Sequence, residues 1–515
     1  MKVFSAEQLQ QADKVTTKKH NISSIDLMER AGTQIFNWLH QRMQGAQVPV
    51  HIFCGIGNNG GDGLVLGRLL IEHGYVVNMY IANFTDKRSK CFLINYDRVK
   101  DITKKWPVLM TSEEDFPEIH PDDIIIDAIF GIGLNRAPEG WVKKLIQYLN
   151  EQKAFRLSID IPSGLHANKP VADKEAVIKA NHTLTFQAPK LAFFLPESGD
   201  FVPYFETIDI GLDPEFLFST EPLAQLTTKQ EAQQFYKQRK KYSHKGDYGH
   251  VLVVGGSYGK MGAAILASKA AYRAGAGLVT AFIPKCGYEI IQTALPEVMA
   301  ITDAYDHLIS EVDDIPQVQA IAVGMGIGTN ERTVNALKKL FSETNSAYVI
   351  DADAINCIAL DKDLKNMIPP QSVLTPHPGE LKRLIGEWTD DYDKLEKVKK
   401  FTSKYKCILL IKGANSIAVY KDKLYINTSG NPGMATGGSG DVLSGMIAGL
   451  MAQGYDPLLA TVFATYLHGM AGNIVSQANS FEAVMAGDIV DHIGKAYLAL
   501  LEPDPPVQPE ENNEQ

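Results

Sequence analysis

The 515-residue sequence has few cysteines, no surplus of positive charge and no long apolar run. Its five cysteines are spread along the chain without CxxC spacing, which argues against a disulfide framework and a cysteine-bound metal. Acidic residues outnumber basic ones by 60 to 50, so a surface that neutralises nucleic-acid phosphates is not expected. No two histidines are three or four residues apart, the spacing of paired metal ligands on a helix.

The first residues also lack the apolar core of a secretion signal, and no apolar stretch reaches membrane-spanning length. Apolar residues make up 45% of the chain and charged residues 21%, which is the ordinary composition of a globular protein. We therefore expect a soluble, cytoplasmic, multidomain protein that binds neither membrane nor nucleic acid.

Short apolar runs that alternate with helical patterns predict an α/β fold with buried parallel sheets. Residues 50–54 and 76–81 have strand composition, and apolar residues at helical spacing lie between them over 64–71. The pattern restarts in the second half with runs such as 251–254 and 278–283. Glycine-rich segments follow several of these runs, at the carboxyl ends of strands, where such sheets bind their ligands.

A stretch with little apolar periodicity and much Gln, Thr and Lys separates the two halves. We predict a first domain over residues 1–220, a linker with a short helix over 221–240, and a second domain over 241–501. Residues 502–515 are acidic and proline-rich with almost nothing to bury, which predicts a disordered tail.

The first glycine-rich loop, residues 55–63, contains GxGxxG between a strand and a helix, a pattern that lets a backbone approach phosphates. A dinucleotide fold also needs an acidic residue at the end of the next strand, and the strand over 76–81 ends in Ala82 and Asn83. An ordinary dehydrogenase is therefore disfavoured. The polar side chains within the loop are typical of a site for a sugar, an amide or an ion.

Two further predicted strands end in carboxylates, Asp127 and Asp160, and Ser163 follows the second of them. The oxygen atoms of Asn59, Asp127 and Ser163 suit a hard cation and do not suit zinc. The alternative is that both aspartates only cap turns, as isolated aspartates usually do. Three such loops in one domain favour a binding site.

In the second domain, the segment 255–261 nearly matches a Walker loop. Its glycine interval is one residue short and Met261 replaces the Ser or Thr that binds magnesium, so we reject a P-loop. The small residues over 262–271 predict a helix that either packs closely or lets a flat ligand approach.

Gly437–Gly440 precede an apolar helical pattern, so their backbone N–H groups are predicted to face an anion at a helix N-terminus. Asp441 falls in the first turn of that helix. It is either a helix cap or a base beside a phosphate, and the density of glycine favours the base. Lys412 and His377 lie in other loops at predicted strand ends, as do the segments 324–328 and 351–354.

The second-domain motifs resemble the ribokinase-like, ADP/ATP-dependent NAD(P)H-hydrate dehydratases. The similar segments are NPGMATGGSGD (431–441), TPHPGE (375–380) and KGAN (412–415). One departure is Ser439, where the family more often has Thr, and the hydroxyl is kept. By this resemblance Ala263, Gly326, His377 and Asp441 contact the hydrate. Those that bind the nucleotide are Lys412, Gly413, Ala414, Asn415, Ser416 and Gly440.

The first-domain motifs resemble the NAD(P)H-hydrate epimerases, through GNNGGDG (57–63), DAIFGIGL (127–134) and DIPSG (160–164). By this resemblance Asn59, Asp127 and Ser163 bind potassium, and Asp160 is our candidate for handling a proton. The residues implied to contact the hydrate are Asn58, Asn59, Gly60, Gly61, Asp62, Gly131, Ile132, Gly133, Leu134, Asn135, Arg136, Ala137 and Asp160.

Joined in this order, the two sets of motifs resemble bifunctional nicotinamide-nucleotide repair enzymes over about residues 1–500. The resemblance implies a Rossmann-like three-layer α/β sandwich followed by a ribokinase-like α/β domain, and a homo-oligomer is expected. The first domain would interconvert the R and S hydrates NADHX and NADPHX. The second would dehydrate the S form with ADP and Mg²⁺, releasing AMP and phosphate.

The residues fit this chemistry, because hydroxide is a poor leaving group and Asp441 beside an anion-binding loop could activate the alcohol for phosphorylation. Two rival functions remain open. The second domain could be a vitamin kinase that leaves the phosphate on its product, and the first domain could be a ligand sensor without chemistry.

Overall fold

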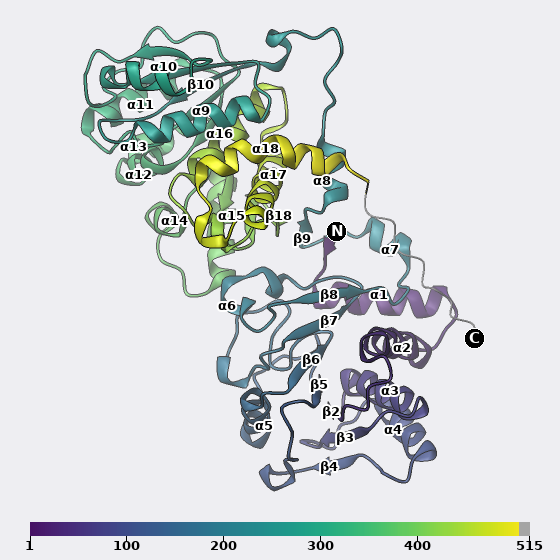
Figure 1. Cartoon of the computed structure of the whole chain (residues 1–515). Coiled ribbons are helices and arrows are strands. Elements are labelled where there is room, and N and C mark those ends of the chain that lie inside the picture. The colour runs from purple at the N-terminus through teal and green to yellow at the C-terminus, as the bar shows by residue number, and fades with distance from the viewer. Residues whose placement is uncertain (504–515) are drawn as a thin grey trace. The chain divides into compact units, whose positions relative to one another are not determined.

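The computed structural model describes residues 1–503, so the predicted tail over 502–515 lies outside the described residues from 504 onward (Figure 1). The described chain divides into two compact units. The first comprises Met1–Gln225 with Asp390–Tyr392, and the second comprises Leu226–Thr389 and the chain from Asp393. Each unit contains a mainly parallel sheet covered by helices, which confirms the predicted α/β class with two domains.

The sheet of the first unit is parallel throughout, in the order β4-β3-β2-β5-β6-β7-β8. Its strands are β2 (Val50–Cys54), β3 (Val77–Ala82), β4 (Val108–Met110), β5 (Ile124–Ala128), β6 (Phe155–Ile159), β7 (His182–Phe186) and β8 (Phe205–Ile208). Apolar runs in the sequence predicted β2, β3, β5 and β6. The strands β4, β7 and β8 were not predicted, because β4 and β8 carry exposed or polar residues and β7 contains two threonines and a histidine.

Helices cover both faces of this sheet (Figure 1). The helices α2, α3 and α4 share one core with alternate residues of β2, such as Ile52, while α5 shares another core with Phe53. This arrangement is a three-layer sandwich. The helices of the first unit are α1 (Ala6–Lys19), α2 (Ser24–Met43), α3 (Asn58–Glu72), α4 (Lys90–Ile102), α5 (Gly140–Glu151), α6 (Pro196–Gly199) and α7 (Pro214–Ser219).

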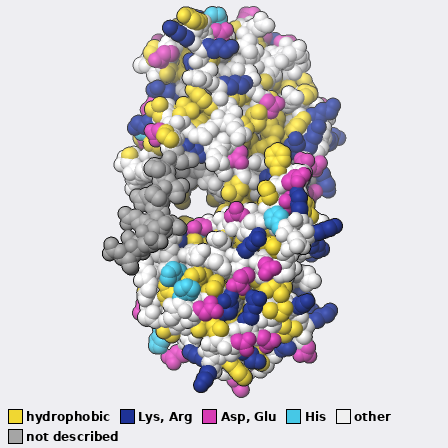
Figure 2. All heavy atoms as spheres, turned by 90° about the vertical axis from the view of Figure 1, so that its right-hand side faces the viewer, with side chains coloured by type: hydrophobic (Ala, Val, Ile, Leu, Met, Phe, Trp, Pro, Cys, Tyr) yellow, Lys and Arg dark blue, Asp and Glu magenta, His cyan; other side chains and the backbone are white. Residues whose placement is uncertain are grey.

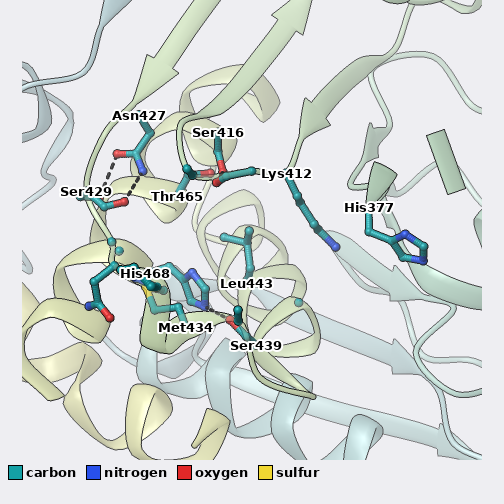
Figure 3. Close-up of a pocket in the computed structure, with 18 of the residues that line it drawn as sticks. His377, Lys412, Ser416, Asn427, Ser429, Met434, Ser439, Leu443, Thr465 and His468 are labelled. Carbon is teal, nitrogen blue, oxygen red and sulfur yellow. Dashed lines mark hydrogen bonds between the residues drawn. The ribbon is translucent and has the colours of Figure 1, made fainter. Parts of the chain in front are cut away.

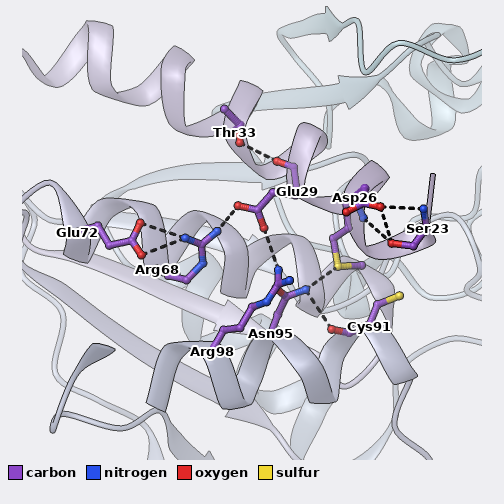
Figure 4. Close-up of polar contacts among 10 residues, drawn as sticks. Ser23, Asp26, Glu29, Thr33, Arg68, Glu72, Cys91, Asn95 and Arg98 are labelled. Carbon is purple, nitrogen blue, oxygen red and sulfur yellow. Dashed lines mark hydrogen bonds and ion pairs between the residues drawn. The ribbon is translucent and has the colours of Figure 1, made fainter. Parts of the chain in front are cut away.

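Ion pairs join the three helices on the first face (Figure 4). Glu29 of α2 pairs with both Arg68 of α3 and Arg98 of α4, and Arg68 also pairs with Glu72 at 3.0 Å. These groups are partly exposed, so each pair contributes at most about 1 kcal/mol. The network links the three helices at their surface.

The second unit has the strand order β18-β17-β16-β15-β14-β13-β10-β11-β12. The strands β16, β17 and β18 pair antiparallel, an edge that the predicted parallel pattern did not include. The strands are β10 (His250–Val254), β11 (Leu278–Ile283), β12 (Met299–Thr302), β13 (Ala320–Val323), β14 (Ala347–Ile350), β15 (Val373–Leu374), β16 (Ile408–Ile411), β17 (Ser416–Tyr420) and β18 (Lys423–Asn427).

The small-residue helix predicted over 262–271 is α9, and it packs closely on α16. A Cβ at Gly445 of α16 would lie 2.1 Å from the Ala267 carbonyl oxygen, and one at Gly449 would lie 2.6 Å from that of Ala271. Of the two predicted roles, close packing therefore applies. The main helices of this unit are α9 (Met261–Arg273), α10 (Tyr288–Ala294), α11 (Glu331–Glu343), α12 (Ala352–Leu360), α13 (Lys362–Asn366), α14 (Pro378–Ile385), α15 (Asp391–Tyr405), α16 (Ser439–Ala452), α17 (Pro457–Ala478) and α18 (Ala486–Leu501).

The segment predicted as a linker contains β9 (Ala224–Leu226) and α8 (Lys229–Phe235). The helix α8 contacts α17 and α18, and its Ala232 is fully buried in the core of the second unit. The strand β9 pairs antiparallel with β1 (Lys2–Val3). Much of the predicted linker is thus ordered secondary structure.

Within residues 1–503, one helix, α17, is long and apolar enough to cross a membrane by length and composition alone. However, 72% of its apolar window is buried within the structure, as in the core helix of a globular unit. On the face shown in Figure 2, Lys and Arg side chains are interspersed with Asp and Glu side chains.

Candidate active sites

The candidate cation ligands of the first unit come together at the carboxyl end of its sheet. Asn59 lies in the first turn of α3, Asp127 lies in β5, and Ser163 follows β6, so the adjacent parallel strands β5 and β6 bring two of them to one edge. Ser163 Oγ donates to Asp127 Oδ1, and Phe130 N donates to Ser163 Oγ at 2.8 Å. Asn59 Nδ2 donates to the Phe130 carbonyl at 3.0 Å.

The oxygen atoms of this cluster differ in their freedom to bind an ion. Asn59 Oδ1 is buried without a hydrogen-bond partner among residues 1–503, which a buried amide oxygen rarely tolerates. Both Asp127 oxygens already accept hydrogen bonds, from Ser158, Ser163 and the backbone of Ile129. The set fits a hard cation through Asn59 and Ser163, while Asp127 orients the serine and supplies charge.

The carboxylate of Asp160, at the end of β6, pairs with a buried lysine that the sequence did not single out. Lys190 Nζ donates to Asp160 Oδ1 and, at 2.6 Å, to Thr185 Oγ1, and its side chain is only 1% exposed. Asp160 itself has a φ of +65°, an unusual backbone conformation for aspartate that aims the side chain at this lysine. A buried lysine of this kind needs a partner, and Asp160 provides it.

Two further carboxyls interact electrostatically with this pair. Burial is the main cause that raises the pKa of Asp62, and the negative charges of Asp160 and Asp13 raise it further. Burial and the charge of Asp160 likewise raise the pKa of Asp13 in α1 to about 6, against the opposing effect of Lys190. Burial in this region therefore favours the protonated form of both carboxyls.

The glycine loop and the segment 131–137 border the same region. Asn58 is exposed at the start of α3, whereas Gly60, Gly61 and Asp62 are buried. A Cβ at Gly131 would lie 3.2 Å from Asn59 Cβ, so the two loops are in contact. In the second loop Gly133, Asn135 and Arg136 are exposed, Ile132, Leu134 and Ala137 are partly buried, and Ile132 packs with Phe4 and Leu9.

In the second unit, the predicted helix N-terminus is the start of α16. Its cap residue is Gly438, which has a φ of +91° and no side chain to occupy the free N–H groups. Gly437 is exposed, and a Cβ placed there would meet no atom of the described chain within 4 Å. The N-terminal N–H groups of a 14-residue helix next to open space form a suitable anion site.

A pocket of about 850 Å³ opens at this helix end (Figure 3). It brings together most of the predicted nucleotide ligands: Lys412, Gly413, Ala414, Ser416 and Gly440. His377 also lines it. Further lining residues that the sequence did not single out come from β18, the loop after it and α17, and include Asn427, Ser429, Asn431, Thr465 and His468.

The protonation of Asp441 suits a general base. Burial is the main cause that raises its pKa to about 6; the negative charges of Asp351, Asp353 and Glu380 add to this and Lys412 opposes it. Because the carboxylate form predominates above that pH, Asp441 is able to accept a proton near neutrality. Glu380, whose pKa is also raised by burial, lies at the same edge of the sheet.

The remaining predicted contacts lie beside the helix ends. Gly326 has a φ of +71°, and a Cβ there would lie 3.5 Å from Ala263 Cβ, so these two residues are neighbours. His377 caps α14: its Nδ1 accepts from Gly379 N at 3.0 Å and its Nε2 lies 3.2 Å from Glu380. The histidine thus has a structural role as well as a place on the pocket wall.

His468 is buried in α17 and its Nε2 lies 3.4 Å from Ser439 Oγ at the start of α16 (Figure 3). Burial, reinforced by the positive charge of Lys412, lowers its pKa to about 4. The histidine is therefore neutral at physiological pH. Its only signal in the sequence was a histidine within a largely apolar helical stretch.

Comparison with known proteins matches both halves of the chain. A family model described as NAD(P)H-hydrate dehydratase matches residues 251–495, and one described as YjeF-related protein N-terminus matches residues 24–192. A bifunctional NAD(P)H-hydrate repair enzyme of Moorella thermoacetica is 35% identical over 511 residues, or 96% of each chain. The Escherichia coli enzyme of the same name is 31% identical and covers 95% of this chain and 92% of its own.

Among solved structures, an ADP/ATP-dependent NAD(P)H-hydrate dehydratase from Bacillus subtilis, crystallised with ATP and Mg²⁺, is 25% identical with a TM-score of 0.47. The match covers 54% of this chain and 99% of that one. The full-length relatives share both units in the same order and nearly the same length. This chain therefore belongs to the family of bifunctional NAD(P)H-hydrate repair enzymes.

Proposed function

We propose that this protein repairs hydrated nicotinamide cofactors. The first unit, predicted over residues 1–220, interconverts the R and S forms of NADHX and NADPHX. The second, predicted over 241–501, dehydrates the S form with ADP and releases AMP and phosphate. The observation that best supports this proposal is a pocket lined by both Lys412 and Gly440 of the uncapped start of α16. Asp441, whose pKa is raised, is the next residue of that helix and is not itself among the lining residues.

Dehydration begins with activation of the C6 hydroxyl, because hydroxide is a poor leaving group. Asp441 accepts the hydroxyl proton while the oxygen attacks the terminal phosphoryl group of ADP, and AMP leaves. The N–H groups at the start of α16 and the Lys412 ammonium stabilise the charge on the phosphoryl group. The ring nitrogen lone pair then expels phosphate, and loss of a C5 proton regenerates the dihydronicotinamide.

Mg²⁺ would neutralise part of the charge on the ADP phosphates. Residues 1–503 contain no cluster of three His, Cys, Asp or Glu side chains arranged to hold a metal. A nucleotide-borne Mg²⁺, held largely by phosphate oxygens, fits this arrangement. The lining residues Asn427, Ser429 and Thr465 offer polar groups to the rest of the nucleotide.

Epimerisation requires the C6–O bond to open and close again on the other face of the ring. C6 is bonded to both the ring nitrogen and the hydroxyl, so the nitrogen lone pair is able to expel water once the hydroxyl is protonated. We propose that Asp160, held by Lys190, handles this proton together with Asp62. Asn59, Asp127 and Ser163 would hold K⁺, which supplies positive charge for orienting the substrate.

The test follows the absorbance of the dihydronicotinamide after mixed R and S hydrates are added with ADP, and then with ATP. Full conversion with ADP is expected, because epimerisation replenishes the S form. A stable phosphorylated product without dihydronicotinamide would instead support the kinase alternative. A full-length Asp441→Asn variant should still convert R hydrate to S hydrate. If it did not, the first unit would not be an epimerase, and the ligand-sensor alternative would be favoured.

The cellular setting is also a proposal. We place the protein in the cytoplasm as a homo-oligomer, where the reduced cofactors it repairs are used. Its partners are small molecules, with neither nucleic acid nor membrane involved.

A further inference from the structure

A buried carboxylate beside the dehydratase pocket has no role in the function described so far. Asp351 follows β14 and is only 2% exposed. Its Oδ1 lies 2.9 Å from Lys412 Nζ and accepts from Ala352 N at 2.8 Å, while its Oδ2 accepts from Ser444 Oγ at 2.6 Å. One carboxylate thus joins two strand ends to the helix that carries Asp441.

The sheet topology explains how these residues meet. The strands β14, β15 and β16 are adjacent and parallel, so Asp351, Thr375 and Lys412 emerge at one edge of the sheet. Ser444 of α16 reaches the same edge, with its Oγ 3.4 Å from Thr375 Oγ1. Ser444 lies one helical turn after Gly440, so the two residues are on the same face of α16. Asp351 is therefore hydrogen-bonded to the face of the helix on which Gly440 lies.

Lys412 in turn lies against that loop. A Cβ at Gly440 would be 3.1 Å from Lys412 Nζ and 3.7 Å from Asp351 Oδ2. The ammonium group is therefore held over the backbone of the helix start, where free N–H groups would face a phosphate. Any side chain at position 440 would intrude on the ammonium.

We propose that Asp351 is a positioning residue for dehydration: it fixes the Lys412 ammonium over Gly440 and, through Ser444, anchors the turn of α16 that follows Asp441. This inference rests on the function proposed for the same site. Lysine has a long flexible stem, so an unpaired Lys412 would have to be ordered in each catalytic cycle. A group already in place stabilises the transferring phosphoryl group without that reorganisation.

Asp351 also acts on the candidate base through its charge. The groups that affect Asp441 are Asp351, Asp353, Glu380 and Lys412, and Asp351 is the strongest of these charges. Removing its negative charge should lower the pKa of Asp441, which its repulsion now raises. Loss of a purely structural contact would leave that pKa in place, so a pH profile distinguishes the two roles.

The test is Asp351→Asn in the full-length protein. Asparagine keeps the shape and one oxygen for Lys412 and Ala352, and its amide can face Ser444, so only the charge is removed. We expect kcat for the S hydrate with ADP to fall about 10- to 100-fold, less than when a direct donor is removed. The acid limb of the kcat–pH profile should move to lower pH.

Two matched variants serve as controls. Ser444→Ala removes a hydrogen bond but leaves the charge, so it should lower kcat less and leave the acid limb in place. Asp361→Asn removes another helix-capping aspartate paired with a lysine, Lys338 at 2.6 Å, outside the pocket lining, and should leave kcat unchanged. Lys412→Met should cost less in the Asp351→Asn background than alone, because the two residues act as a unit.

If folded Asp351→Asn had the kcat of wild type and an unmoved acid limb, the positioning role of Asp351 would be overturned. The proposed function would not be affected by that result. Additive effects of Asp351→Asn and Lys412→Met would overturn the positioning role as well. If the wild-type protein itself failed to dehydrate the S hydrate with ADP, the proposed function would fall and this role with it.

Discussion

The two glycine-rich loops look alike in sequence, yet their glycines meet different needs. In the first loop a Cβ at Gly55 would lie 1.9 Å from the Ile129 carbonyl oxygen, and one at Gly60 would lie 1.7 Å from that of Gly55. In the second, a Cβ at Gly437 would meet open space and one at Gly440 would lie 3.1 Å from Lys412 Nζ. The first loop needs glycine mainly so that backbones can cross closely, whereas the second leaves room for a ligand.

The candidate catalytic aspartates differ in the same sense. Asp160 accepts a hydrogen bond from the ammonium of buried Lys190, whereas burial, reinforced by the negative charge of Asp351, raises the pKa of Asp441 to about 6. Both aspartates are candidates for proton transfer, and they differ in that a bonded lysine balances the charge of Asp160. Glycine density alone, which is similar in both loops, does not reveal this difference.

Replacement of Asp441 should show the largest effect. In Asp441→Asn we expect dehydration of the S hydrate to fall by about 10³-fold or more, because general base catalysis is lost. ADP binding, measured by calorimetry, should be retained because the free N–H groups of α16 remain. Near-normal turnover in this variant would refute the role of Asp441 and the contrast between the loops.

Replacement of Lys190 probes the compensated carboxylate. Lys190→Met leaves Asp160 buried without its counter-charge, so we expect the free energy of unfolding of the first unit to fall by about 3–5 kcal/mol. Urea denaturation measures this loss, and conversion of R to S hydrate should disappear with it. Adding Asp160→Asn should restore part of the stability but not the epimerase activity; a single variant as stable as wild type would contradict the ion pair's importance.

Alanine substitutions compare the two loops directly. Gly60→Ala forces a methyl group against a backbone carbonyl and should destabilise the first unit by about 1–3 kcal/mol or more. Gly437→Ala adds a methyl group in open space and should change stability by less than about 0.5 kcal/mol. Thermal unfolding measures both, and equal losses would show that the loops are not different in packing.

The pH dependence gives the smallest effect. Asp441 must be unprotonated to act as a base, so kcat for dehydration should fall as the pH drops through about 6. Below that value the loss should approach about tenfold per pH unit. A profile that stays flat down to pH 5 would show that Asp441 is not the titrating base.

Local patterns predicted the central strands and both helix starts, because continuous apolar runs and glycine at a helix terminus are short-range signals. They placed Asp351 in a loop at a strand end but did not predict its contacts, and they did not single out Lys190 or His468. All three residues act through partners far along the chain. Lys190 meets Asp160 only through the pairing of β6 with β7, and Lys412 meets Asp351 only through the order of β14, β15 and β16. The order of strands in a sheet cannot be predicted from a local segment of sequence.

The antiparallel edge escaped prediction for a related reason. The turn between β17 and β18 consists of Lys421 and Asp422, and Lys421 adopts a φ of +53° without the Asn-Gly or Asp-Gly signal of a tight hairpin. The roles of individual site residues, including the potassium ligands, remain predictions.

Burial of two titrating groups near the start of α16 has a consequence for acid tolerance. His468, with a pKa of about 4 against 6.5 when unfolded, makes the fold weaker as the pH falls between those values. Asp441, with a pKa of about 6 against 3.8, does the opposite, since the folded state takes up its proton first. The stabilisation that Asp441 contributes on acidification nearly offsets the destabilisation that His468 contributes. The Asp441→Asn protein should therefore have a larger free energy of unfolding than wild type at neutral pH and lose that advantage as the pH falls. The wild-type protein is less stable at pH 7, but its stability should change less in mild acid.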